Sequence, residues 1–115
     1  MSRGWLVAAA LLGLASVAFG AFGAHGVADP KAQEWLRTGA VYGFVHVLAA
    51  FAAERFGARW AQGLFVVGAA IFAGTLWAMA MGGPRVLGAV TPVGGLSLMV
   101  GWGLMAWRVA RRPDP

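Results

Sequence analysis

The chain has 115 residues, of which 60% are hydrophobic and 11% are charged. Soluble domains have roughly 45–50% apolar and about 25% charged residues, so these proportions exclude an ordinary soluble domain. The net charge is +5, from nine lysine and arginine residues against four acidic ones. In a chain with long apolar runs, this surplus indicates membrane topology rather than nucleic-acid binding. The absence of cysteine excludes disulfides and thiolate metal sites.

The charged residues divide the chain into four apolar tracts, the first of which has no Asp, Glu, Lys or Arg from Gly4 to Ala28. About 20 apolar residues span a hydrocarbon core of ~30 Å, and the second tract reaches that length if Arg37 snorkels outward. We predict helices near residues 4–25, 34–55, 60–82 and 87–108, followed by a short polar tail at 109–115. Short links make neighbouring helices antiparallel. The predicted fold is therefore an all-α membrane protein, a single domain forming a four-transmembrane-helix antiparallel bundle.

The N-terminal segment also has features of a secretory signal peptide. Met-Ser-Arg precedes an apolar run that ends in Ala-Phe-Gly-Ala, a pattern typical of a cleavage site. Cleavage would leave three spans. Because the uncharged run is long for a signal sequence, we expect it to remain as the first span, which N-terminal sequencing would test.

The start of the fourth helix has an alternative too. Pro92 is tolerated near a helix start, whereas Gly94 and Gly95 weaken the turn that follows. A start near Pro92 would leave Val86–Thr91 as an irregular segment buried by protein.

Lysine and arginine residues are divided unequally between the two ends of the predicted bundle. One end has six of them, namely Arg3, Arg55, Arg59, Arg108, Arg111 and Arg112. The other end has three, namely Lys31, Arg37 and Arg85. Because positive residues are enriched in cytoplasmic loops, this division predicts a multi-pass protein with both termini in the cytoplasm.

Small residues recur at four-residue spacing and predict where the helices touch, because close packing at small side chains holds membrane helices together. On the third helix the stripe consists of Ala70, Gly74, Ala78 and Gly82. The other predicted packing residues are Gly20 on the first helix, Gly39 and Gly43 on the second, and Gly101 on the fourth.

The few polar residues within the spans gather in the outer half of the membrane. Thr38, Tyr42 and His46 are four residues apart, so they share one side of the second helix. We predict one polar pocket that opens outward, lined by His25, Arg37, Thr38, Tyr42, His46, Thr75 and Thr91. Its arginine and histidine suit a small anionic or lipid-like ligand, such as a lipid headgroup.

Each of these side chains also has a purely structural interpretation. Threonine hydroxyls bond to their own helix, an interfacial tyrosine belongs to the aromatic belt, and a buried histidine finds an interhelical partner. The alternative function is therefore a structural or interaction subunit, which packs on a membrane-protein partner or forms a homo-oligomer through its small-residue faces. Ordinary packing inside one monomer explains the same residues.

Metal, haem and enzyme interpretations lack the residues that they need. His25 and His46 differ in depth by ~10–18 Å, which is too far for two axial ligands of one haem. The spans contain no supporting carboxylate or thiolate for a metal, and no nucleophile with a base, although His25 and Asp29 share a loop. We expect no metal, no cofactor and no enzymatic activity. Transport is not excluded, although residues that small transport proteins use are absent. The sequence contains no asparagine, which fluoride channels of similar size use in their pore, and its first span contains no glutamate, on which small multidrug transporters depend.

Several motifs point to a known family. They are Gly20-Ala21-Phe22-Gly23-Ala24-His25-Gly26, Thr38-Gly39 with Tyr42 and His46, Phe72-Ala73-Gly74-Thr75, Thr91-Pro92-Val93-Gly94-Gly95 and Gly101-Trp102. With these motifs nearly the whole chain resembles the transmembrane protein 256-like family of small four-helix membrane proteins, whose bacterial members are catalogued as a domain of unknown function. The resemblance implies an integral protein of the bacterial inner (plasma) membrane without an established activity. Ala73 and Trp77 replace a common serine and tyrosine, which puts in doubt any role that depends on hydroxyl groups of the third helix.

Overall fold

The computed structural model describes residues 2–113, which form helices joined by short turns. The elements are α1 (Ser2–His25), α2 (Pro30–Arg55), α3 (Arg59–Ala80), the 3-10 helix η1 (Arg85–Ala89) and α4 (Thr91–Arg111). Four helical segments are long and apolar enough to cross a membrane. The prediction of an all-α, four-helix membrane protein is therefore confirmed.

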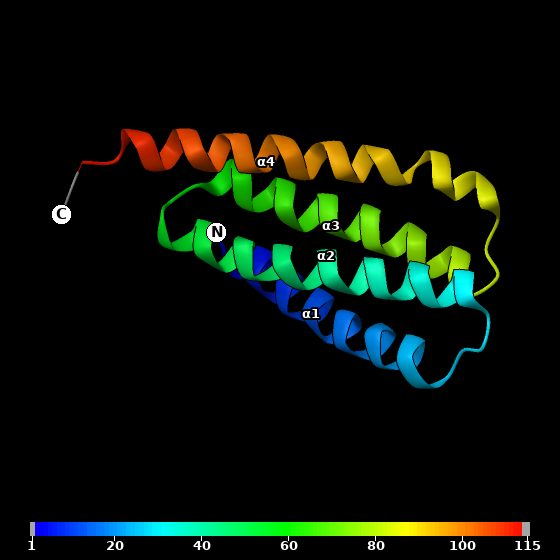
Figure 1. Cartoon of the computed structure of the whole chain (residues 1–115). Helices are drawn as coiled ribbons and strands as arrows, with labels where there is room; N and C mark the ends of the chain where they lie inside the picture. The colour runs from blue at the N-terminus through cyan, green and yellow to red at the C-terminus, as the bar shows by residue number, and fades with distance from the viewer. Residues whose placement is uncertain (1, 114–115) are drawn as a thin grey trace.

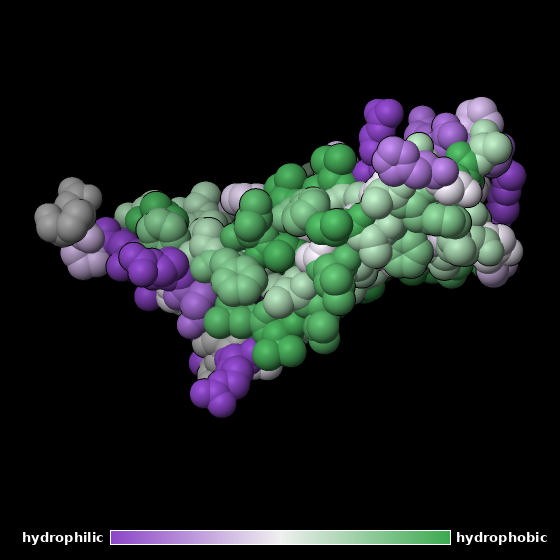
Figure 2. All heavy atoms as spheres, turned by 90° about the horizontal axis from the view of Figure 1, so that it is seen from below, coloured by the Kyte–Doolittle hydropathy of each residue, from purple (hydrophilic) through white to green (hydrophobic). Residues whose placement is uncertain are grey.

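The four long helices lie side by side in chain order, each antiparallel to the next (Figure 1). Helices α2 and α3 are central, while α1 packs mainly on α2 and α4 mainly on α3. The bundle is thus an open row rather than a closed square. On the face that Figure 2 shows, hydrophobic side chains cover the middle of the molecule and hydrophilic ones gather at both ends, as the bilayer requires.

Two helix ends differ from the predicted ones because of local capping. The Asp29 carboxylate accepts a hydrogen bond from the Ala32 amide at 3.1 Å, and Pro30 occupies the first turn, so α2 begins four residues before residue 34. Helix α3 ends at Ala80 rather than at residue 82, since Gly82 has a φ of 98°. Only glycine adopts that conformation readily, and it ends the helix. Asp29 is therefore a capping residue of α2.

The fourth helix begins at Thr91, close to the alternative start at Pro92, and the predicted start at residue 87 is wrong. Residues Arg85–Ala89 form η1 instead. Proline lacks an amide hydrogen and belongs in a first helical turn, which is why the α-helix starts beside it. At its other end α4 continues to Arg111, so the tail is shorter than predicted and its last two residues lie outside the described range.

The core lies between α2 and α3 and is built largely from alanine. Ala50, Ala69 and Ala73 are completely buried, together with the larger Leu36 and Phe65. Small side chains let the two central helices approach closely, which compensates for the weak hydrophobic drive between helices in lipid.

The four predicted packing glycines of α1, α2 and α4 lie at close helix contacts. A Cβ atom at Gly20 would lie 3.2 Å from Ala40 Cβ, and one at Gly101 would lie 2.8 Å from Phe65 Cε1. A Cβ atom at Gly39 would lie 2.5 Å from Trp77 Nε1, and one at Gly43 would overlap the Ser16 hydroxyl.

The predicted packing face of α3 needs correction. Ala70 is exposed, Ala78 is only partly buried, and a Cβ atom at Gly74 would meet no atom within 4 Å. The buried face contains Ala73 and Trp77 instead, one residue or about 100° further round the helix. The physical reason is that the large Trp77 side chain of α3 packs against Gly39 of α2. The small residue of this contact therefore lies on α2 and not on α3.

Candidate functional site

The structure does not bring the seven predicted pocket residues into one cavity. Arg37 and Thr38 line a hollow between α1 and α2. Tyr42 and His46 line a groove between α2, α3 and α4. Thr75 and Thr91 form a hydrogen bond with each other. His25 is exposed at the C-terminal end of α1.

His46 is buried and uses both ring nitrogens inside the protein. The indole Nε1 of Trp102 donates to His46 Nε2 at 2.9 Å, and His46 Nδ1 lies 2.7 Å from the Tyr42 carbonyl oxygen. Indole nitrogen can only donate, so Nε2 must be the acceptor and Nδ1 must carry the proton that is donated to Tyr42. His46 is therefore an interhelical link between α2 and α4.

The two threonines form a second interhelical link. The hydroxyl oxygens of Thr75 and Thr91 are 2.6 Å apart, which joins α3 to the start of α4. Each hydroxyl also lies within hydrogen-bond distance of a carbonyl oxygen of its own segment. Thr75 can donate to the Ile71 carbonyl at 2.8 Å, and Thr91 can donate to the Leu87 carbonyl at 3.1 Å. The hydroxyl that donates to its own segment is the acceptor in the bond between the two threonines. These hydroxyls hold the bundle together and satisfy each other's hydrogen-bonding capacity.

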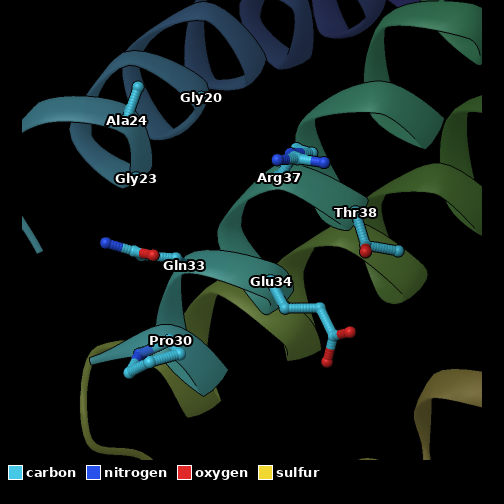
Figure 3. Close-up of a pocket in the computed structure, with 8 residues that line it drawn as sticks. All are labelled: Gly20, Gly23, Ala24, Pro30, Gln33, Glu34, Arg37 and Thr38. Atoms are coloured by element: carbon cyan, nitrogen blue, oxygen red, sulfur yellow. The ribbon is translucent and has the colours of Figure 1, made fainter. Parts of the chain in front are cut away.

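We call the hollow between α1 and α2 the outer hollow, where outer means the end of the bundle with the turn between α1 and α2. It has a volume of about 570 Å³ and is lined by Gly20, Gly23, Ala24, Pro30, Gln33, Glu34, Arg37 and Thr38. Figure 3 shows the small residues of α1 on one side of it and the polar residues of α2 on the other. Close contact of Gly23 with Leu36 brings the two helices together beside the hollow.

Two polar groups of the outer hollow already have partners, whereas Arg37 and Thr38 have none among the described residues. Glu34 forms an ion pair with Lys31 at 3.1 Å, and the Gln33 amide donates to the Val27 carbonyl at 2.6 Å. Within residues 2–113, Arg37 forms no ion pair or side-chain hydrogen bond. Its guanidinium is thus available to an anion from outside the chain.

We call the space between α2, α3 and α4 the apolar groove. It has a volume of about 700 Å³ and is lined by Tyr42, His46, Phe72, Pro92, Gly95, Leu96, Leu98, Met99 and Trp102. Tyr42 packs on Phe72 with their ring centroids 4.7 Å apart. Because its histidine and tryptophan bond to each other, the groove presents mainly carbon atoms to the bilayer.

Sequence reasoning did not identify two of the interhelical donors. Trp102 bonds to His46, and Trp77 Nε1 donates to the Leu36 carbonyl oxygen at 3.3 Å. The signal was the position of both indoles inside apolar spans, where a polar nitrogen needs a partner.

Comparisons with known proteins agree on one family. Residues 19–95 match the family described as "Protein of unknown function (DUF423)". A UPF0382 inner membrane protein of Escherichia coli is 37% identical, with 90% of this chain and 87% of the relative covered. The chain belongs to the DUF423/UPF0382 family of membrane proteins. Membership in a small membrane-protein family of unknown function, expected from the motifs, is thereby confirmed.

Other DUF423/UPF0382 relatives come from further organisms. A UPF0382 membrane protein of Haemophilus influenzae is 33% identical, with 93% of this chain and 94% of the relative covered. One from Schizosaccharomyces pombe is 37% identical, with 88% and 96% covered. No solved structure matches the chain. The DUF423 match includes the whole outer hollow, whereas the groove continues beyond it to Trp102.

Proposed function

We propose that this DUF423/UPF0382 protein is a binding protein of the bacterial inner membrane, not an enzyme, and that it holds the headgroup of an anionic phospholipid in the outer hollow. The observation that carries the proposal is the guanidinium of Arg37, which lines that hollow and has no partner within residues 2–113. The inner-membrane location is supported by the name of the Escherichia coli relative.

The depth of Arg37 suits a headgroup. Arg37 lies seven residues after Pro30, the first residue of α2, which corresponds to about 10 Å along the helix. The 26 residues of α2 extend over roughly 39 Å, close to the ~40–45 Å of a bilayer with its headgroups. The guanidinium can therefore snorkel into the headgroup layer, where it would bind phosphate oxygens in a bidentate manner.

The shape and charge of the outer hollow support the same ligand. Gly20, Gly23 and Ala24 form a wall without bulky side chains, which leaves room for a phosphate. The Glu34 carboxylate is paired with Lys31, so the positive charge of Arg37 is not cancelled. The small walls and the guanidinium of Arg37, which has no partner within residues 2–113, favour an anionic ligand over a neutral one.

The proposed orientation has both termini in the cytoplasm. Its support is the division of lysine and arginine residues, six at the end with the termini and three at the other. In this orientation the outer hollow would bind lipids of the leaflet opposite to the cytoplasm.

Native mass spectrometry of the full chain in a gentle detergent tests the binding proposal. Phosphatidylglycerol and phosphatidylcholine with identical acyl chains are the probes. We expect preferential retention of phosphatidylglycerol, and about a tenfold loss of this preference in Arg37→Gln, equivalent to about 1.4 kcal/mol. Ala24→Phe, which fills the hollow, should weaken retention as well.

Arg85→Gln is the matched control, because Arg85 lies at the same end of the bundle over the Trp35 ring and does not line the outer hollow. It should retain the preference. Equal retention of both lipids by the unmodified protein, or an unchanged preference in Arg37→Gln, would refute the proposal.

A second function is favoured by the open face of α3. Ala70 is exposed, and Gly74 has free space beyond its Cα atom although α3 is a central helix. We propose as the alternative that a membrane partner or a second copy packs there, since small residues allow close helix approach. Gly74→Leu should then dissociate the complex in native mass spectrometry while the lipid preference is unchanged.

A further inference from the structure

We infer that one acyl chain of the bound anionic lipid lies in the apolar groove, so that the two hollows together hold a single phospholipid. This inference rests on the proposed function and adds the position of the tail. The outer hollow would take the phosphate at Arg37, and the groove between α2 and α4 would take the hydrocarbon.

The two hollows are adjacent along α2. Thr38 lines the outer hollow and Tyr42 lines the groove. These residues are four apart on one side of the helix, with a separation of about 6 Å along its axis. Tyr42 is 46% exposed, so the passage from one hollow to the other lies at the protein surface and is open to lipid.

The groove also has the direction and length of a lipid tail. On α4 its lining begins at Pro92, one residue after the helix start, and ends at Trp102. The ten steps from Pro92 to Trp102 rise about 15 Å, which is half of a hydrocarbon core of ~30 Å. A chain that leaves a headgroup at Arg37 and passes Thr38 would therefore follow the groove toward the bilayer midplane.

The chemistry of the lining favours hydrocarbon. Phe72, Leu96 and Met99 supply apolar surface, and the absence of a side chain at Gly95 leaves space between them. The polar nitrogens of His46 are both engaged, so a hydrocarbon chain leaves none of them without a partner. A polar ligand would find few free donors or acceptors there and would lose its own hydrogen bonds.

Photolabelling tests this inference on the full-length protein. The probe is phosphatidylglycerol with a diazirine in the middle of one acyl chain, at one equivalent per protein in gentle detergent, followed by peptide mapping. Leu96 and Met99 of the groove are 61% and 70% exposed, whereas Leu11 and Leu14 of α1 are 60% and 68% exposed and lie outside it. We expect about fivefold more label on the groove pair, the preference of a site worth about 1 kcal/mol.

Two variants give the result its control. Gly95→Leu fills the groove and should abolish the excess label, while Gly103→Leu on the same helix, which meets no neighbouring atom within 4 Å, should leave it unchanged. Met99→Trp fills the groove from an exposed position and replaces Gly95→Leu if that variant does not fold, with the label then measured at Leu96.

Equal labelling of the two exposed pairs, or excess label that persists in both groove-filling variants, would overturn the inference. The headgroup preference of the unmodified protein and of Arg37→Gln is measured without reference to the tail. If the unmodified protein prefers phosphatidylglycerol but is labelled evenly, only the tail position is refuted. If the unmodified protein shows no such preference, the proposed function is refuted.

Discussion

The Trp102 indole donates to His46 Nε2 across 2.9 Å and thereby joins α4 to α2, two helices that have almost no backbone contact with each other. Trp102 also packs on Phe65, with ring centroids 4.9 Å apart. The edge helix α4 is therefore held by a few directional contacts in addition to its packing on α3.

We expect a measurable coupling energy between His46 and Trp102. In a double-mutant cycle with His46→Phe and Trp102→Phe, the free energies of unfolding should be non-additive by about 0.6 to 1.7 kcal/mol, the range known for hydrogen bonds inside membranes. Denaturation in mixed micelles of increasing dodecyl sulfate content measures these energies. Trp107→Phe serves as the control because Trp107 is exposed on the same helix. Additive effects would show that the bond contributes nothing to stability.

Two glycines should respond oppositely to the same substitution. Gly39→Ala places a methyl group against the Trp77 indole and should destabilise the protein by about 1–3 kcal/mol, whereas Gly74→Ala meets open space. In a helix, alanine is also intrinsically favoured over glycine by about 1 kcal/mol, so Gly74→Ala should be neutral or stabilising. Thermal unfolding in detergent, followed by circular dichroism, compares the two variants. Equal melting temperatures would contradict the observed packing.

The link between Thr75 and Thr91 should protect the start of α4. In Thr91→Val the hydroxyl is replaced by a methyl group of similar size, and the bond to Thr75 is lost. We expect amide hydrogen exchange in residues 85–91 to rise by about fivefold, which corresponds to about 1 kcal/mol of local stability. Thr38→Val, outside this pair, should leave the exchange of that segment unchanged.

The orientation can be tested with single cysteines, because the natural chain has none. Ala28→Cys lies in the exposed turn between α1 and α2, and Pro113→Cys follows α4. A membrane-impermeant maleimide added to intact cells should label Ala28→Cys, and should label Pro113→Cys only after permeabilisation. The reverse pattern would place both termini outside the cytoplasm.

The sequence predicted the fold class well because the bilayer imposes a length and a polarity on every span. The tracts between charged residues identified all four helices without any knowledge of their contacts. Helix ends were predicted less well, since they depend on single interactions such as the cap that Asp29 provides to Ala32. The packing face of α3 was misplaced because helical spacing finds a small-residue stripe at Gly74 but does not reveal which neighbour, here Trp77, needs the space.

The candidate site, like the fold, was predicted from the sequence only in part. By itself, the sequence determined that a few polar residues lie in apolar spans, since hydropathy and the rise of a helix fix composition and depth. Only the tertiary structure decided which of them pair, because partners such as His46 and Trp102 are 56 residues apart and meet through the arrangement of the helices. Those pairings leave Arg37 beside a polar hollow and turn the expected single pocket into two neighbouring ones.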